Sequence, residues 1–254
     1  EIGFVHESLQ RVQKPCFRSV VDTYLLSGGQ VFTIPVTLDV PEDTALKSGQ
    51  ILHLLFQGKH VADMEVEDSY RMTDADIEKV FCTLDMTHPG VKKEKERSPL
   101  RVGGKTTLLD KTLLEDALKP ENTKKIFADK GWKSVVGFQT RNPIHKAHEH
   151  LQRIGLEVCD GLFINPIIGW KKKGDFTQEA VVAAYEKMVE EFYPQNSVYM
   201  AGLKTQMRYA GPREAVFHAI IRRNLGCTHF IIGRDHAGVG GFYGAYDAHA
   251  LARK

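Results

Sequence analysis

Apolar and polar residues alternate in two different ways along the chain, and the change comes near residue 133. Before that position the apolar runs are short, rich in β-branched and aromatic residues, and separated by turn residues. This pattern is typical of β-structure. We expect strands over residues 17–26, 31–34 and 36–38, and a hairpin that joins residues 51–56 to residues 61–66 through a turn at Gly58.

One short helix and a polar loop follow these expected strands. Residues 74–82 have helical character, and Thr73 or Asp74 can cap the helix because both side chains accept hydrogen bonds from free backbone N–H groups. The segment His88-Pro89-Gly90 and the charged run 92–97 are predicted to form a surface loop.

From residue 133 onward, short apolar runs alternate with segments of helical periodicity. Strands separated by helices in this way indicate βαβ units and a parallel sheet. A polar stretch at residues 119–122 marks the boundary, so we divide the chain into a β-rich domain over 1–118 and an α/β domain over 119–254. The expected strands of the second domain are 135–138, 161–164, 198–200 and 228–232, and its expected helices are about 143–155, 178–192 and 212–224.

Length and composition narrow the class of protein. The 254 residues are 42% hydrophobic and 26% charged, which is close to the average of globular proteins. No run approaches the roughly 18 apolar residues of a membrane span, and residues 1–4 lack the features of a signal peptide. The cysteines are too far apart for a zinc knuckle or a disulfide ladder, and they fit a reducing compartment; they are Cys16, Cys82, Cys159 and Cys227. We therefore expect a cytoplasmic protein with no membrane partner.

The formal net charge of +2 conceals two unequal halves. Residues 1–132 hold 18 basic and 21 acidic residues, whereas residues 133–254 hold 16 and 11. The positive excess in the second half would attract a small polyanion. Because the basic residues are interspersed with acidic ones and form no long stripe, we expect no nucleic-acid partner.

Polar and cationic residues follow each of the four expected parallel strands. Ligands of such sheets bind outside the carboxyl ends of the strands. We therefore expect a ligand site at this edge. The residues concerned are Gln139-Thr140-Arg141-Asn142 after the first strand, Asn165-Pro166 and Lys171–Lys173 after the second, Gly202, Lys204 and Arg208 after the third, and Gly233-Arg234-Asp235-His236 after the fourth.

The segment after the first strand carries the strongest signal. Asn142 suits the N-cap of a helix and Pro143 its first position, which places His145 and His148 on one helix face. A helix N-terminus attracts anions, so two imidazoles beside Arg141 predict a polyphosphate site. Two alternatives remain open: a metal site formed by the histidines of this segment, and histidines with no role. The spacing does not fit the zinc-protease motif H-E-x-x-H.

Two other glycine-containing motifs bear on phosphate binding. Gly103-Gly104-Lys105-Thr106 resembles the end of a P-loop, but Pro99 stands where that motif requires its first glycine, so we reject it. In residues 233–238 the glycines permit close approach of a ligand, and Arg234 can bind phosphate or sulfate. Arg213, at the start of the last expected helix, is expected to be structural.

Four motifs in this order resemble the ATP sulfurylase family. They are Q-T-R-N-P-x-H-x-x-H at 139–148, I-G-W-x-K-K-G-D at 168–175, M-R-Y-A-G-P-R-E-A at 207–215 and G-R-D-H-A-G at 233–238. The resemblance extends forward to residues 32–39 and 88–92. It implies an α/β protein with an N-terminal β-rich PUA-like domain, followed by a Rossmann-like parallel α/β nucleotidyltransferase domain. Family members carry a further small domain, which the resemblance would place after Lys254.

The resemblance also implies the reaction. The family joins sulfate to the α-phosphate of ATP by in-line attack, giving adenosine 5′-phosphosulfate and pyrophosphate, or runs the reverse. Mg²⁺ would enter with ATP, no metal would be held by the protein alone, and a homo-oligomer is expected. One competing function is another adenylyltransferase with a phosphate acceptor. The other is RNA binding through the PUA-like front, which the acidic balance of residues 1–132 disfavours.

Individual site residues follow from the same resemblance. Those matching the catalytic core are Thr140, Arg141 and Asn142, with His145 and His148 as transition-state stabilisers. Those matching the sulfate site are Gln139, Arg141 and the backbone of Ala237. Those matching the nucleotide site are Gln139, Asn142, Gly233, Arg234, Asp235 and His236.

Overall fold

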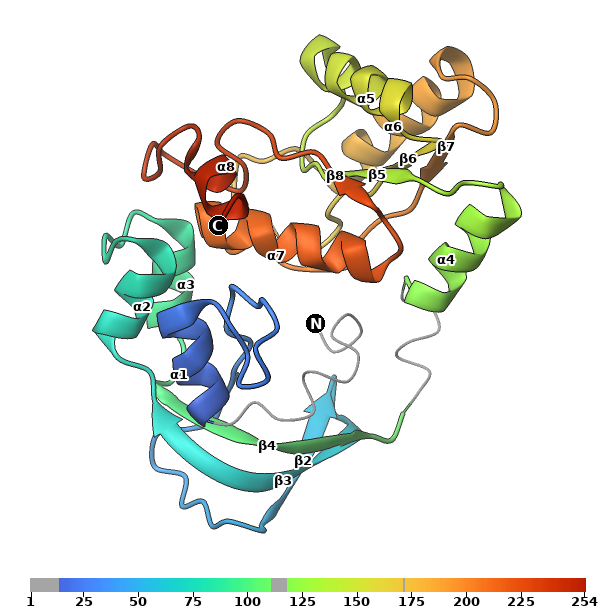
Figure 1. Ribbon diagram of the computed structural model, residues 1–254. Coiled ribbons are helices and arrows are strands. Elements are labelled where there is room, and N and C mark those ends of the chain that lie inside the picture. The colour runs from blue at the N-terminus through green and yellow to red at the C-terminus, as the bar shows by residue number, and fades with distance from the viewer. Residues whose placement is uncertain (1–13, 111–117, 171) are drawn as a thin grey trace. The chain divides into compact units, whose positions relative to one another are not determined.

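The computed structural model describes residues 14–110, 118–170 and 172–254 (Figure 1). These residues form two compact units. The α/β unit consists of residues 118–207 and 218–233, and the β-rich unit consists of residues 14–110, 208–217 and 234–254. The chain therefore passes between the units more than once, and each unit is described by itself.

A curved antiparallel sheet forms the centre of the β-rich unit (Figure 1). Its strand order is β1-β4-β3-β2, with β1 at Leu38–Asp39, β2 at Ile51–Phe56, β3 at Lys59–Arg71 and β4 at Leu100–Leu108. Gln57 and Gly58 have φ angles of 51° and 79°, as in the two-residue turns that favour hairpins. The predicted hairpin is thereby confirmed.

Short helices complete this unit: α1 at Lys14–Thr23, α2 at Asp74–Phe81, α3 at Pro89–Lys95 and α8 at Asp247–Ala252. The predicted helix at residues 74–82 is confirmed as α2. Its N-cap is Thr73, which forms a capping box with Asp76, and Cys82 ends it in a left-handed conformation.

Three predictions for the front of the chain are wrong. Residues 17–26, expected to be a strand, lie largely in helix α1, whose buried side chains recur at helical spacing (Phe17, Val20 and Val21). Of the strands expected over residues 31–38, only the short β1 and one isolated bridge form. Residues 89–95, expected to be loop, form α3 because the buried His88 imidazole caps it, accepting hydrogen bonds from Gly90 N and Val91 N.

The rejection of a P-loop at residues 103–106 agrees with the structure, because these residues lie in β4. A side chain at Gly104 would come within 1.9 Å of the Glu65 carbonyl on β3. This glycine therefore permits two strands to approach closely.

The α/β unit contains the predicted four-stranded parallel sheet, with strand order β7-β6-β5-β8. Helices α5 and α6 lie on the same side of this sheet (Figure 1), and α6 buries Val181 and Tyr185 against it. The strands are β5 at Val135–Phe138, β6 at Gly161–Ile164, β7 at Val198–Met200 and β8 at His229–Phe230. The helices are α4 at Pro120–Asp129, α5 at Lys146–Val158, α6 at Gln178–Phe192 and α7 at Gly211–Asn224. Only the second half of α7, from His218 onward, belongs to this unit.

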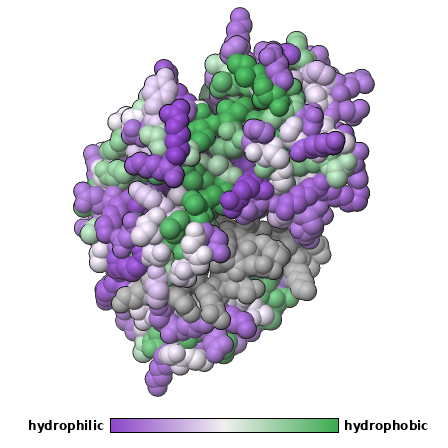
Figure 2. Space-filling view, viewed as in Figure 1, coloured by the Kyte–Doolittle hydropathy of each residue, from purple (hydrophilic) through white to green (hydrophobic). Residues whose placement is uncertain are grey.

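Helix α5 also carries an apolar face that is open to solvent. Leu151, Ile154 and Val158 recur at helical spacing and are 37%, 45% and 70% exposed. An apolar patch is visible over this helix in Figure 2.

No helix in the described part of the chain is long and apolar enough to cross a membrane. The four cysteines, Cys16, Cys82, Cys159 and Cys227, are free thiols in the structure.

Candidate active site

The loop after β5 does not start α5 where the sequence predicted. Asn142 was expected to cap the helix, but α5 begins at Lys146, and its N-cap is His145, which makes no side-chain cap hydrogen bond. The Asn142 N–H is instead bonded to the Thr140 hydroxyl at 3.0 Å. Thr140 and Asn142 thus form a turn of their own, and Pro143 follows the turn and lies ahead of the helix.

The two histidines of this loop lie against each other. The rings of His145 and His148 are stacked, with centroids 3.7 Å apart and planes 27° apart. The His148 ring also contacts Phe138 edge-on at 5.3 Å, and its Nδ1 lies 3.4 Å from the Tyr185 hydroxyl. The structure therefore brings the predicted pair together at the start of α5, with His145 exposed and His148 half-buried.

The surroundings of His148 determine its charge. Burial lowers the pKa of His148 to about 4, and the neighbouring His145 acts in the same direction. A hydrogen bond with the Pro143 backbone opposes this shift without cancelling it. At neutral pH the His148 ring is therefore uncharged, with one nitrogen able to donate a hydrogen bond and the other able to accept one.

Arg141 faces an acidic residue that the sequence did not assign to the site. Its Nε lies 3.7 Å from Asp175 Oδ2, and Lys172 Nζ lies 2.9 Å from Asp175 Oδ1. Asp175 belongs to the loop between β6 and α6, and its side chain is only 8% exposed. Asp175 does not cap α6, because the N-cap of that helix is Thr177. The sequence held one signal of this contact: Lys172 and Asp175 stand three residues apart within the motif at 168–175.

The loops after β5, β6 and β7 are joined by backbone hydrogen bonds. Ile167 N donates to Thr140 O at 3.0 Å, and Met207 N donates to Trp170 O at 3.1 Å. A side chain at Gly169 would come within 1.8 Å of the backbone of the neighbouring loop, so glycine is required there. The loops after these three strands therefore lie side by side at the carboxyl edge of the sheet, as the sequence led us to expect for them.

Arg222 on α7 is fully buried. Its Nη2 donates to Asn165 O at 2.9 Å, at the end of β6, and its guanidinium lies 5.9 Å from the centre of the Phe230 ring. Burial lowers the pKa of Arg222 to about 9. Asn165 Nδ2 in turn donates to Ala201 O at 2.5 Å. Arg222 therefore holds the β6 end in place, a role that the periodicity of α7 does not reveal.

The loop after β8 is divided between the units. Gly233 belongs to the α/β unit, and Arg234, Asp235, His236 and Ala237 belong to the β-rich unit. Within the β-rich unit, Asp235 N donates to Ala245 O at 2.8 Å and Ala237 O accepts from Gly211 N at 3.1 Å. Arg234 and Asp235 are exposed, whereas His236 and Ala237 are buried.

Arg213 has the structural role that was expected of it. It is 6% exposed, and its guanidinium lies 4.3 Å from the centre of the Tyr24 ring. Its Nη2 donates to Val21 O at 2.8 Å, and its Nη1 donates to Val20 O and Thr33 O at 3.3 Å each.

The lysine triplet after β6 lies partly outside the described residues, because Lys171 is not among them. Lys172 pairs with Asp175, and Lys173 is exposed.

Comparison with protein families identifies both parts of the chain. Residues 115–254 match the ATP-sulfurylase family, and residues 12–111 match the PUA-like domain. The chain therefore belongs to the ATP-sulfurylase family, which confirms the resemblance and the two-part fold expected from the sequence.

Several relatives carry the name sulfate adenylyltransferase. The protein of Hyperthermus butylicus is 43% identical over 244 residues, which are 94% of this chain and 63% of the relative. That of Pyrococcus abyssi is 45% identical, over 91% of this chain and 62% of the relative. That of Trichodesmium erythraeum is 42% identical, over 93% and 63%. This chain thus spans somewhat less than two thirds of the length of these curated relatives.

Among solved structures, the chain resembles a hexameric APS kinase from Thiobacillus denitrificans. The TM-score is 0.66 at 18% sequence identity, and the match covers 94% of this chain and 43% of the other. At this identity the likeness concerns the fold alone.

Proposed function

We propose that this chain carries the active site of a sulfate adenylyltransferase, which joins ATP and sulfate into adenosine 5′-phosphosulfate and pyrophosphate or runs the reverse. The observation that carries the proposal is the stacked pair of His145 and His148, which follows β5 at the carboxyl edge of the parallel sheet, in the same segment as Arg141. The names of the relatives support the same activity.

In this proposal the sulfate binds at Gln139 and Arg141, with the backbone of Ala237. A guanidinium offers paired N–H donors that match two oxygens of a tetrahedral anion, which an ammonium group does not. The nearly buried Asp175 carboxylate lies on the Nε side of Arg141 and limits its orientation. Asp175 is therefore a positioning residue for the sulfate site.

The nucleotide binds on the other side of the reacting atoms, with Mg²⁺ entering as part of the MgATP substrate. Thr140 and Asn142 keep the loop after β5 in the turn described above. We assign this binding to the residues that the family resemblance indicated: Gln139, Asn142, Gly233, Arg234, Asp235 and His236. We also propose the division at residues 118 and 119 as the boundary between the PUA-like and the nucleotidyltransferase domains.

The reaction needs orientation and charge stabilisation more than it needs acid–base groups. Sulfate is already ionised, so one of its oxygens attacks the α-phosphorus directly and no base removes a proton. As this bond forms, the bond between the α-phosphorus and the oxygen that bridges to the β-phosphate breaks, and that oxygen leaves with its electron pair on pyrophosphate. Hydrogen bonds from the His145 and His148 rings stabilise the charge that passes to pyrophosphate.

The test is the formation of ATP from adenosine 5′-phosphosulfate and pyrophosphate by the purified chain, together with sulfate-dependent exchange of pyrophosphate into ATP. The proposal expects both activities. Exchange supported by nicotinate or pantetheine phosphate, with none from sulfate, would show a related adenylyltransferase. Binding of structured RNA without either activity would favour the RNA-binding alternative. Cytoplasmic location and homo-oligomerisation remain predictions.

A further inference from the structure

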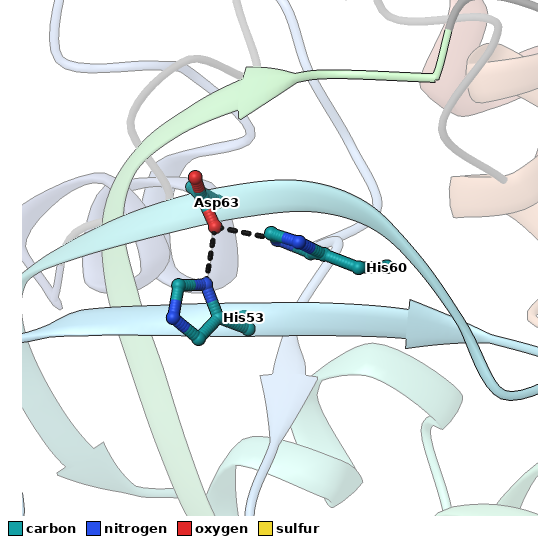
Figure 3. A group of neighbouring side chains, drawn as sticks. All are labelled: His53, His60 and Asp63. Atoms are coloured by element: carbon teal, nitrogen blue, oxygen red, sulfur yellow. Dashed lines mark hydrogen bonds and ion pairs between the residues drawn. The ribbon is translucent and has the colours of Figure 1, made fainter.

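Three side chains on the β2–β3 hairpin converge on one point (Figure 3). His53 Nδ1 and His60 Nε2 each lie 2.7 Å from the same oxygen, Asp63 Oδ1. The two rings are nearly perpendicular, with centroids 4.7 Å apart. All three residues lie in the β-rich unit, and none of them belongs to the proposed sulfate and nucleotide site.

An irregularity in the strand pairing creates this convergence. His53 on β2 lies directly opposite Asp63 on β3. His60 and Asp63 are three residues apart, so in a regular strand they would point to opposite faces of the sheet. Leu54 pairs with Ala62 but Leu55 pairs with His60, which leaves one extra residue, Val61, in β3.

The extra residue changes the face to which His60 belongs. Val61 and its neighbour Ala62 are both buried, at 2% and 0% exposure, although they are consecutive in a strand. This bulge turns His60 to the outer face, where Asp63 lies. Bulges are known to redirect side chains in this way.

The three side chains supply a set of ligands that suits zinc. Two imidazole nitrogens and a carboxylate oxygen are common Zn²⁺ ligands, and three protein ligands with one water complete a tetrahedral site. The three ligand atoms all lie within 4.8 Å of one another. Tetrahedral ligands at about 2.0–2.1 Å from zinc are about 3.3 Å apart, so a small opening of the cluster admits the ion.

Access also permits binding. The side chains of His53, His60 and Asp63 are 65%, 40% and 31% exposed, so an ion and its remaining water can reach them. An imidazole can bind zinc through the nitrogen that faces Asp63 while its other ring nitrogen carries the proton.

We propose that His53 Nδ1, His60 Nε2 and Asp63 Oδ1 form a Zn²⁺ site with water as the fourth ligand. The bound ion clips β2 to β3 across the bulge. Within the described residues, no other group of three histidine, cysteine or acidic side chains is gathered closely enough to hold a metal ion.

The test is calorimetric titration of the metal-free full chain with ZnCl₂ alone. The wild type is expected to bind one equivalent, and zinc is expected to raise its melting temperature. Asp63→Asn and His53→Gln, tested separately, are expected to weaken zinc binding at least about tenfold, since even outer-shell losses cost 10- to 100-fold. His53→Gln changes an exposed side chain and Asp63→Asn a partly exposed one, and equal melting temperatures without metal would show that both fold as the wild type does.

Two variants serve as matched controls. His150→Gln removes an exposed histidine from helix α5, and His148→Asn removes a member of the stacked pair. Both are expected to keep the single zinc equivalent. The proposal is overturned if the wild type binds no zinc, or if zinc binding is lost in a control variant and kept in Asp63→Asn and His53→Gln.

Discussion

Arg141 Nε and Asp175 Oδ2 lie 3.7 Å apart, although 33 residues of chain separate them. This ion pair links two of the motifs that the sequence analysis treated one by one, Q-T-R-N-P at the end of β5 and K-K-G-D before α6. The Asp175 carboxylate also approaches Lys172. A nearly buried acid therefore orients Arg141, the cation of the proposed sulfate site, and the surroundings of that cation come from two loops.

The first prediction concerns Arg141→Lys. Lysine keeps the positive charge but loses the paired N–H donors. The kcat/KM for sulfate is therefore expected to fall about 10- to 100-fold, which corresponds to the free energy of one charge-assisted hydrogen bond. The Kd of ATP should change much less. Initial rates at varied sulfate, together with equilibrium ATP binding, measure this. Arg153→Lys, on the exposed face of α5, is the matched control, and equal losses for both ligands would contradict the assignment.

Arg234→Ala should act on the nucleotide. Arg234 is exposed at the start of the loop after β8, where a cation can reach bound phosphates. We expect weaker binding of both ATP and adenosine 5′-phosphosulfate, which calorimetry with each ligand measures. Arg253→Ala, an exposed arginine of the same unit, should leave both affinities unchanged. If Arg234→Ala also leaves them unchanged, the loop is structural.

His148→Asn should lower turnover more than affinity. Removal of one preorganised donor to developing charge costs about 2.7–4 kcal/mol in the barrier, or about 10²- to 10³-fold in rate. Nucleotide affinity should fall only modestly because other donors remain. Single-turnover release of pyrophosphate measures the rate, and His150→Asn on the same helix is the control. If His148→Asn keeps the wild-type turnover rate, the two histidines have no role in transfer. If the wild type holds one equivalent of zinc that His148→Asn has lost, the histidines form a metal site.

The low pKa of His148 predicts a pH dependence of stability. The folded protein holds this ring neutral down to about pH 4, whereas an unfolded histidine binds its proton near pH 6.5. The unfolded state thus binds more protons between these values, so the stabilisation from the neutral ring is present above about pH 6.5 and is lost as pH falls toward 4. Urea unfolding at several pH values should show a steeper decline in the wild type than in His148→Asn. If the free energies of unfolding of the two proteins decline in parallel as pH falls, the lowered pKa of His148 is contradicted.

Two neighbouring arginines of α7 provide a stability test. Arg222 is fully buried and binds the carbonyl of Asn165, whereas Arg223 is exposed. Arg222→Ala leaves a cavity and an unpaired carbonyl, so the free energy of unfolding is expected to fall by about 2–5 kcal/mol. Arg223→Ala should change it by less than about 0.5 kcal/mol. Denaturant unfolding of the two variants measures the difference.

The α/β unit was more predictable from sequence than the β-rich unit. Its strands are short runs that alternate with helices, and two of them, residues 135–138 and 161–164, are fully buried, so the apolar pattern located them. The errors elsewhere have local causes. Helix α3 is capped by the His88 imidazole, and histidine is not among the residues that usually indicate a helix start. Phe17, Val20 and Val21 fit one face of a helix as well as they fit an apolar strand.

The candidate site was predictable in part. His145 and His148 were placed on one helix face, and the structure stacks their rings, although α5 starts later than expected. Asp175 and Arg222 could not have been found in this way. Their partners, Arg141 and Asn165, lie 34 and 57 positions away in sequence, and only the folded sheet brings such residues together.

The contacts of Arg213 have a consequence for the order in which the β-rich unit can be completed during synthesis. The backbone carbonyls of Val20, Val21 and Thr33 receive their hydrogen bonds from a guanidinium that lies 193, 192 and 180 residues later in the chain. A ribosome that adds about 5–20 residues per second needs roughly 10–40 s to reach it. Until then the segment around α1 lacks its donor, so a segment made well before Arg213 reaches its final packing only after Arg213 has been added.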